Sequence, residues 1–296
     1  MHTRFLTALA LIFFAADFDA NSLAAQGEPD DIAVMTFNIR YDNPSDPIQW
    51  DERRSHVVEA IRYYDIVGVQ EALEHQYAFL AGEISRFAHY GVGRDDGGAL
   101  GGDGGAAGEF CPIFWNAKRF DLLHSETLWL NEDGAVGVPG WDADLPRIAT
   151  DVMLYDRNTG QTIRVINTHF SHSGPQARES AATLIRLRLR RSSADFNVLL
   201  GDLNAEVGSP ALTALVGAGT GTDSGGLSDA HDLADTRCRQ RFGTFTGFDT
   251  AGLQGAPRID HILTDCKHVT WFCVDERIIR TNYISDHLPV YVMLRP

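Results

Sequence analysis

The sequence predicts an α/β fold in which two mixed β-sheets pack face to face with helices outside. Early in the chain, short apolar, β-branched runs alternate with helix-spaced segments, and later runs follow one another as hairpins. Many of these runs end on a polar residue that can do chemistry. With 44% hydrophobic and 22% charged residues, the 296-residue chain has ample material for one large core.

The N-terminal half alternates between the two kinds of element. The expected strands are residues 32–37, 65–69, 110–115 and 120–130. The expected helices, whose apolar residues recur at helical spacing, are 50–64 and about 74–87. Residues 93–109 contain too much glycine for a regular element and are expected to form a mobile surface loop.

The C-terminal half is richer in strands. The expected strands are 149–155, 162–167, 198–200, 258–263, 269–274 and 288–294. The first two of these are expected to pair as a hairpin with Gly160 at its turn, and 258–263 is expected to pair with 269–274. A helix is expected at 176–191, with a buried stripe made of Ala181, Leu184, Ile185 and Leu189.

In the stretch NVLLGDLNAE, residues 197–206, an apolar strand is followed directly by polar residues that could bind a ligand. Asp202 and Asn204 follow an apolar strand and, two residues apart in an extended chain, point to the same side. At the end of a buried strand they would face a cleft floor, where desolvation is costly without a partner. A metal ion or a reacting phosphate would pair with both side chains.

Five other strand ends carry similar residues. A lone Asp or His in such a place is more often a cap or a structural residue, but six in one chain are hard to explain in that way. The six motifs are TFNIR (Asn38), GVQEA (Glu71), NTHFSH (His169, His172), GDLNA (Asp202, Asn204), RIDHI (Asp260) and SDHLP (Asp286, His287). Their Asn, Asp and Glu oxygens suit Mg²⁺ or Mn²⁺, whereas no His/Cys spacing typical of zinc is present.

In this order and spacing, the six motifs resemble those of the endonuclease/exonuclease/phosphatase superfamily. Its members include deoxyribonucleases, abasic-site endonucleases, inositol polyphosphate 5-phosphatases, neutral sphingomyelinases and deadenylases. The resemblance covers about residues 31–294 and implies a four-layer α/β sandwich and metal-dependent hydrolysis of a phosphoester. The segments 41–46, 93–109, 140–149 and 172–180 resemble an exported bacterial branch.

The resemblance also implies a role for each motif residue. Glu71 would be the main ligand of Mg²⁺ or Mn²⁺, with Asn38 beside it and Asp286 completing the metal cluster. Asp202 would orient and deprotonate the attacking water, and Asn204 would help hold the water or a phosphate oxygen. The remaining implied catalytic residues are His287, paired with Asp260, and His169, which would hydrogen-bond the scissile phosphate.

The sequence departs from the nuclease members of the superfamily at Arg40. Several of them carry an acidic metal-holding residue there, whereas an arginine would contact phosphate. This favours a member that handles other phosphoesters. Arg147 and Arg178 are further candidates for phosphate binding, with surface salt bridges as the alternative. Arg94, Asp95 and Glu109 are expected at the cleft mouth, although the acidic residues of that loop could instead bind Ca²⁺.

The net charge bears on the partners. A formal charge of −15 and a pI of about 5.0 make the chain a poor generic partner for nucleic acid. The run RLRLRR at 186–191 alternates with leucine and is expected to be a solvated helix face. A small or lipid-linked phosphoester is therefore the favoured substrate, and nucleic acid is disfavoured. We expect a monomer.

The N-terminus predicts export. Residues 1–25 contain Arg4, an apolar stretch and a small-x-small cleavage site, as a signal peptide does, which leaves 26–296 as a single catalytic domain. The apolar stretch is too short to serve as a membrane anchor, so a secreted or periplasmic protein is expected. Of the four cysteines, Cys266 and Cys273 flank an expected turn and are the favoured disulfide, with four free thiols as the alternative.

Three functions remain open from the sequence. The first is a secreted Mg²⁺- or Mn²⁺-dependent phosphoesterase that cleaves a phosphodiester or a phosphomonoester. The second is an extracellular nuclease. The third is a catalytically silent binding protein, which the intact motif set disfavours, and a two-carboxylate glycosidase would not explain the Asn and His residues.

Overall fold

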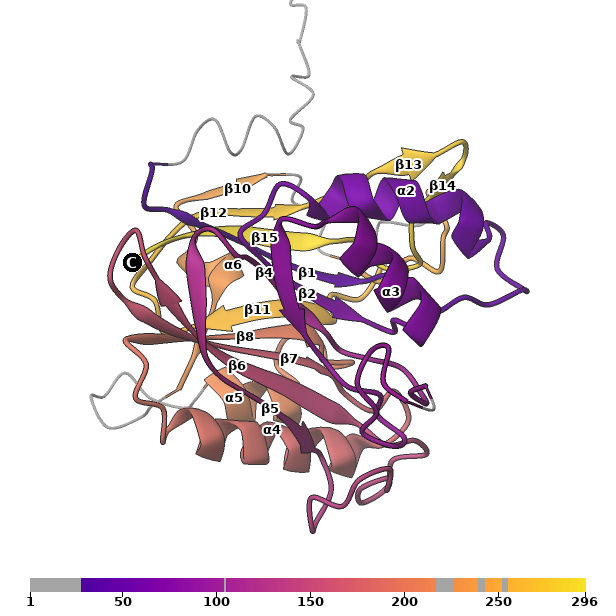
Figure 1. Cartoon of the computed structure of the whole chain (residues 1–296), viewed down its shortest axis with the longest axis horizontal. Coiled ribbons are helices and arrows are strands. Elements are labelled where there is room, and N and C mark those ends of the chain that lie inside the picture. The colour runs from indigo at the N-terminus through magenta and orange to yellow at the C-terminus, as the bar shows by residue number, and fades with distance from the viewer. Residues whose placement is uncertain (1–27, 104, 217–225, 239–242, 252–254) are drawn as a thin grey trace, which may run out of the picture.

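The computed structural model describes residues 28–103, 105–216, 226–238, 243–251 and 255–296. Two large sheets pack against each other, and helices cover their outer faces (Figure 1). Helices α2 (Trp50–Ile61) and α3 (Glu74–Glu83) lie over one sheet, and α4 (Pro175–Leu189) and α5 (Pro210–Val216) lie over the other. The predicted four-layer α/β sandwich is confirmed. The predicted signal peptide, residues 1–25, lies outside the described residues.

The first sheet has seven strands in the order β10-β12-β15-β1-β2-β4-β3. Their bounds are β10 Thr236–Cys238, β12 His268–Val274, β15 Val290–Arg295, β1 Ile32–Asn38, β2 Ile66–Gln70, β4 Ile113–Asn116 and β3 Phe87–Tyr90. Strands β1 and β2 are parallel and lie near its centre. Their burial along the whole length explains why they are apolar runs without alternation.

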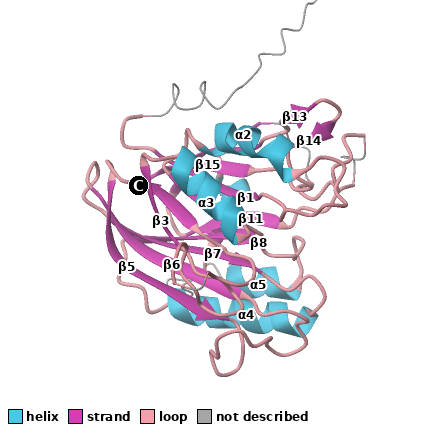
Figure 2. Ribbon diagram, turned by 45° about the vertical axis from the view of Figure 1, so that its right-hand side comes forward, coloured by secondary structure: helices cyan, strands magenta, loops and turns pink. Residues whose placement is uncertain are grey.

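The second sheet has six strands in the order β5-β6-β7-β8-β11-β9. Their bounds are β5 Phe120–Trp129, β6 Ile148–Asp156, β7 Thr162–His169, β8 Phe196–Asp202, β11 Asp260–Thr264 and β9 Ser228–Asp229. Three small elements complete the described chain, namely α6 (Ala230–Leu233) and the hairpin of β13 (Ile278–Ile279) and β14 (Asn282–Tyr283). Figure 2 shows the two sheets layered between their helices.

The main core lies between the sheets and is built from their inward-facing aliphatic side chains. Where β2 and β8 face each other, the two sheets approach so closely that a Cβ on Gly68 would lie 2.0 Å from Leu200 Cδ1. Beside this contact Gln70 Nε2 donates to Asn167 Oδ1 at 2.7 Å, and Asn167 Nδ2 donates to the Val69 and Pro112 carbonyls. A buried polar lock, Gln70–Asn167, therefore joins the sheets directly behind the motif residues.

The expected hairpin of 258–263 with 269–274 is wrong. β11 pairs with β8 and β9 in the second sheet, whereas β12 pairs with β15 and β10 in the first. The chain crosses from one sheet to the other between these strands, so two runs adjacent in sequence have no common ladder. Local periodicity predicts each strand but carries no information about its sheet.

The same crossover makes the predicted Cys266–Cys273 disulfide wrong. Cys273 is the register partner of Cys238 on the neighbouring parallel strand β10, and these two form a disulfide. Cys111 and Cys266 are free thiols, and both are buried. Strand β10 lies in a long segment that the sequence analysis left without elements, so the true partner of Cys273 was overlooked.

Smaller differences follow from local packing. The expected helix over 74–87 ends at Glu83, and the chain then turns into β3. Leu184, expected on the buried stripe of α4, is 38% exposed. In the run 186–191, Arg188 donates to the buried Asp151 at 3.0 Å, so this helix face is not wholly solvated. Among the described residues, no helix is long and apolar enough to span a membrane.

Candidate active site

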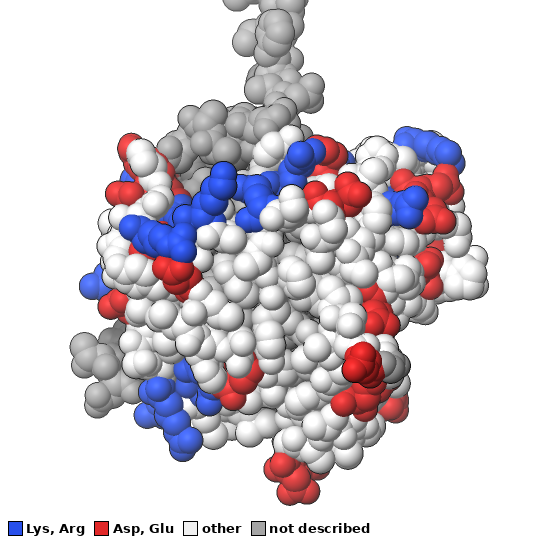
Figure 3. Space-filling model, in the orientation of Figure 1, with Lys and Arg blue, Asp and Glu red and all other residues white. Residues whose placement is uncertain are grey.

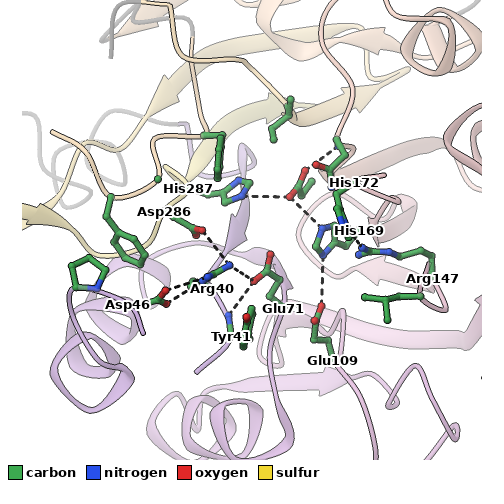
Figure 4. Close-up of a pocket in the computed structure, with 18 residues that line it drawn as sticks. Arg40, Tyr41, Asp46, Glu71, Glu109, Arg147, His169, His172, Asp286 and His287 are labelled. Atoms are coloured by element: carbon green, nitrogen blue, oxygen red, sulfur yellow. Dashed lines mark hydrogen bonds and ion pairs between the residues drawn. The ribbon is translucent and has the colours of Figure 1, made fainter. Parts of the chain in front are cut away.

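The strand ends of both sheets meet at one edge and line a cleft of about 830 Å³ (Figure 4). The cleft receives polar residues from five of the six motifs directly. Its walls are formed by Arg40, Tyr41, Asp46, Pro47, Glu71, Glu109, Leu145, Arg147, His169, His172, Asp202, Asn204, Phe245, Gly247, Phe248, Ile259, Asp286 and His287. The remaining motif residues, Asn38 and Asp260, lie just behind this wall, where each hydrogen-bonds a residue that lines it.

Strand register brings three of the side chains together. On parallel strands β7 and β8, His169 is the partner of Asp202, and on antiparallel strands β8 and β11, Asp202 is the partner of Asp260. Directly paired residues project to the same face of a sheet. Residues 91 positions apart in sequence, from His169 to Asp260, thus form one row across three strands.

Backbone strain is concentrated where the chain leaves these strands. Arg40, Glu71 and Asn204 have φ values of 59°, 61° and 45°, in the left-handed region that non-glycine residues seldom adopt. Gly201 has φ of 145°, and a Cβ there would lie 1.9 Å from the Thr168 carbonyl oxygen. Strain of this kind costs on the order of 1–3 kcal/mol per residue and is typical of functional sites.

The carboxylate of Asp202 lies at the centre of the polar contacts in the cleft. Its Oδ2 accepts a hydrogen bond from Asn38 Nδ2 at 3.0 Å and lies 3.4 Å from His169 Nε2 and 3.6 Å from His287 Nε2. Its Oδ1 accepts from the Asn204 backbone N–H at 2.9 Å. A carboxylate held in this way by neighbours on both sheets has a fixed direction.

Burial and nearby charges shift the pKa values of Asp202 and His287. Burial raises the pKa of Asp202 to about 7, against the opposing effect of His287. Burial alone would lower the pKa of His287, but the carboxylates of Asp260 and Asp202 raise it well above its usual value. The region is therefore a buried acidic site with one histidine held as a cation, and an added cation would favour ionised Asp202.

His287 is fixed by Asp260, as the resemblance implied. Its Nδ1 lies 2.9 Å from Asp260 Oδ2, and its ring packs 5.0 Å from that of Phe245. Asp260 is itself oriented, because its backbone N–H donates to Thr244 Oγ1. With Nδ1 occupied in this way, the Nε2–H of His287 faces the cleft.

Arg40 occupies the acidic end of the cleft. Its Nε and Nη2 each donate to Asp46 at 3.1 Å, while its Nη1 lies 3.5 Å from Asp286 and 4.0 Å from Glu71. Burial disfavours this guanidinium cation, yet the bonds to Asp46 and the charges of Asp286 and Glu71 raise its pKa overall. Arg40 thus lies between Glu71 and Asp286, two of the predicted metal ligands.

A cluster of donor atoms could hold a metal ion. Oxygen atoms of Glu71 and Asp202 and a nitrogen of His287 lie within 4.8 Å of one another. Asn38, the predicted ligand beside Glu71, presents its Nδ2 to both carboxylates, because its Oδ1 accepts the Arg40 backbone N–H at 3.0 Å. Two convergent carboxylates offer the oxygen ligands that a small hard divalent cation prefers.

The opposite end of the cleft is cationic. Arg147 donates from Nη2 to His172 Nδ1 at 3.0 Å, and Arg94 donates to Glu109 at 2.7 Å. Glu109 Oε2 in turn lies 3.8 Å from His169 Nδ1. Burial, reinforced by Arg147 and Arg94, holds the pKa of His169 well below its usual value, so this ring is neutral.

The structure places the remaining candidates differently. Arg178 does not line the cleft, because its Nη1 donates to the carbonyls of Ser171 and His172, behind the loop that carries them. Asp95 is also absent from the cleft wall. Tyr41 and Asp46, which do line it, lie in segment 41–46, which was noted only for its resemblance to the exported branch. Phe248 also lines it but was not singled out from the sequence.

Comparison with known proteins gives one family. The model of the Endonuclease/Exonuclease/phosphatase family matches residues 35–287. A search of curated proteins finds no match. Among solved structures, an endonuclease/exonuclease/phosphatase from Bacteroides vulgatus is 32% identical, with a TM-score of 0.78 over 90% of this chain and 98% of that one.

Two further structures resemble this chain. A mannosyl-6-phosphatase from Bacteroides thetaiotaomicron is 28% identical, with a TM-score of 0.77 over 89% of this chain and 100% of that one. The human Nocturnin catalytic domain, solved with a bound sulfate, is 20% identical, with a TM-score of 0.65 over 90% and 94% of the two chains. This last similarity concerns the fold alone.

Proposed function

Because the chain belongs to the endonuclease/exonuclease/phosphatase family of hydrolases, we propose that it is an exported, Mg²⁺- or Mn²⁺-dependent phosphoesterase. We assign it a small phosphomonoester, in particular a sugar phosphate, as substrate. The observation that carries the proposal is the environment of Asp202, whose Oδ2 is shared by Asn38, His169 and His287 at the floor of the cleft.

The residues of the cleft fit in-line attack of water on phosphorus. Asp202 orients the water and accepts its proton, a role for which its fixed direction suits it. His287, kept protonated by Asp260, donates from Nε2 to a phosphate oxygen. His169, which is neutral, and Asn204, which lies just after the end of β8, supply further hydrogen bonds without adding charge.

Glu71 and Asp202 would hold the divalent cation, since His287 as a cation is a poor ligand. When bound, this ion neutralises charge on the phosphate and stabilises the developing charge of hydrolysis. Asn38 keeps the two carboxylates apart and correctly directed through its bonds of 2.9 Å and 3.0 Å. Asp286 and Asp46 would not contact the cation directly, because Arg40 pairs with both of them.

Two observations support a small ester over nucleic acid. The relative named mannosyl-6-phosphatase shares 28% identity over nearly the whole chain, which favours a sugar phosphate. A nucleic-acid strand needs an extended basic track, whereas the face drawn in Figure 3 carries basic side chains in separate patches, with acidic side chains beside them.

The disulfide between Cys238 and Cys273 supports export, because such bonds persist in oxidising compartments. The proposed location is therefore the periplasm or the extracellular space. It could be checked by expressing the full chain and locating the protein by cell fractionation, with the 26–296 chain as the control.

The test of function is ester turnover with and without metal. p-Nitrophenyl phosphate, bis-p-nitrophenyl phosphate, mannose 6-phosphate and plasmid DNA would be compared in Mg²⁺, in Mn²⁺ and in EDTA, with Asp202→Asn as the matched control. Metal-dependent release of phosphate from the monoesters supports the proposal. Nicking of DNA with the monoesters untouched would assign a nuclease, and no turnover with metal bound would leave a silent binding protein.

A further inference from the structure

The cationic end of the cleft contains a guanidinium without an adequate anion. Arg147 is only 5% exposed, and its Nε and Nη1 have no hydrogen-bond partner among the described residues. Burial, together with Arg94, lowers its pKa, which shows that its charge is poorly compensated. A buried charge without a partner is costly, and a native protein retains one where a ligand supplies the counter-charge.

The neighbouring charges do not supply that counter-charge. The one carboxylate at this end of the cleft wall is Glu109, and Arg94 already binds it through Nη1 at 2.7 Å. Two arginines therefore share a single carboxylate. His169 and His172 carry no negative charge, and burial raises the pKa of the Cys111 thiol so that it stays neutral. The more distant Asp202 also acts on Arg147, but its Oδ2 is already shared by Asn38, His169 and His287.

The contact with His172 fixes the hydrogen on that ring. A guanidinium can only donate, so Arg147 Nη2 donates and His172 Nδ1 must accept, at 3.0 Å. The hydrogen of the neutral imidazole is then on Nε2. His172 is exposed and lines the cleft, and Figure 4 shows His172, His169 and Arg147 together on one side of the cleft. The pair thus offers a fixed N–H donor backed by a positive charge.

We propose that Arg147 and His172 form an anion subsite that makes the enzyme prefer the dianionic phosphate of a monoester to the monoanionic phosphate of a diester. This inference rests on the proposed function and specifies which phosphoesters the enzyme prefers. The subsite lies next to His169, which is in the same row as Asp202. A phosphate held at Asp202 has oxygens on the side away from Glu71 and the cation, and these oxygens would face His169, His172 and Arg147.

The decisive variant is Arg147→Met, which keeps most of the side-chain volume and removes the charge. We expect kcat/KM for p-nitrophenyl phosphate to fall about 30-fold or more, the scale of one lost charge-assisted hydrogen bond. For bis-p-nitrophenyl phosphate we expect a fall of less than about threefold. His172→Ala should show the same selective loss, and the double variant should be little worse because the two residues act as one unit.

A readout without turnover separates this inference from the proposed function. With Mg²⁺ present, titration of inorganic phosphate into the otherwise wild-type protein by calorimetry should show at least about tenfold weaker binding when Arg147→Met is introduced. Arg186→Met, which removes a charge from the outer helix, should bind phosphate as the wild type does. If no ester is hydrolysed by the wild type, the proposed function fails, but this titration still tests the subsite.

The melting temperature excludes a merely structural role. Since Arg147 leaves two buried donors without partners, Arg147→Met should melt at or above the wild-type temperature. Equal losses of kcat/KM on both esters, unchanged phosphate binding, or a large fall in melting temperature would each overturn the proposal. The last of these results would make Arg147 a residue that stabilises the fold.

Discussion

Arg119 and Arg147 are both buried arginines, with 7% and 5% of their surface exposed, but they are bonded very differently. Arg119 lies where β5 begins and uses every nitrogen of its guanidinium. It binds Asp156 through Nε and Nη2, Asp65 through Nη1, and the carbonyls of residues 30 and 31. The guanidinium of Arg147, at the cleft, has one hydrogen bond to the described residues, to His172.

The difference distinguishes two uses of a buried charge. Around Arg119 each charge has a partner inside the protein, so the cluster joins the N-terminal segment to the second sheet. In the cleft, Arg40 and Arg94 are paired with carboxylates, whereas the guanidinium of Arg147 keeps two nitrogens without a partner among the described residues. Sites that bind a ligand can keep buried polar groups without partners, and the stability of the rest of the fold offsets the free energy that these groups cost.

The largest effect that the comparison predicts is for Asp202→Asn. We expect kcat to fall by about 10³-fold or more, because the group proposed to orient and activate the water is lost. Stability should stay the same or rise, since a buried carboxyl with a pKa of about 7 is relieved of its burial cost. Steady-state kinetics and thermal denaturation would check both, and a clear loss of stability would contradict the idea of an unsatisfied cleft.

Arg119→Met should show the opposite pattern. Removing one partner of a buried ion pair costs about 3–5 kcal/mol, because Asp156, which is fully buried, keeps an uncompensated charge. Urea unfolding would measure that loss. The kcat of the folded enzyme should be unchanged, and a selective loss of activity without loss of stability would remove the distinction between the two arginines.

The disulfide offers a second structural test away from the cleft. Replacing both Cys238 and Cys273 by serine should cost about 2–4 kcal/mol, since the bond closes a loop of 35 residues. Activity at 25 °C should persist. Retained stability in dithiothreitol would indicate that the bond contributes little to the folded state.

A smaller effect concerns pH and Asp229. Although burial opposes ionisation, hydrogen bonds from His261 and Arg258 hold the pKa of Asp229 well below its usual value. A depressed carboxyl pKa adds stability above the unfolded value of about 3.9, and that stability is lost as the pH falls through the folded value. Thermal denaturation between pH 7 and pH 2 should therefore show a steeper acid loss for the wild type than for Asp229→Asn.

Asp229→Asn should also be less stable than the wild type at pH 7, because Arg258 loses its ion pair of 2.8 Å. Curves that run parallel over the whole pH range would show that Asp229 does not contribute in this way. The cleft carboxyl Asp202, whose pKa is raised, should give no such acid-labile stabilisation.

Much of the fold followed from local pattern. Strands such as β1 and β8 are unbroken apolar runs, and the residues just after them form the cleft, as the motif positions predicted. The crossover between β11 and β12 could not be predicted, because sheet membership depends on contacts distant in sequence. The disulfide depended on that crossover and was mispredicted with it.

The sequence predicted which residues form the candidate site better than it predicted how they are arranged in space. Asp202, Asp260 and His169 are named by their motifs, but only strand register shows that they form one row. Arg178 and Arg147 look alike in sequence, yet Arg178 binds backbone carbonyls and Arg147 reaches the cleft. The direction in which a side chain points depends on its neighbours in three dimensions.

The Gln70–Asn167 lock between the sheets has a consequence for heat inactivation. Glu71 follows Gln70 directly, and His169 lies two residues after Asn167, so the lock sets how the two halves of the cleft align. If the sheets slid past each other by a single side-chain diameter, Glu71 on the first sheet and Asp202 on the second would separate while both sheets stayed intact. Enzymatic activity would then vanish below the temperature at which secondary structure melts, and the gap between those temperatures would measure resistance to shear.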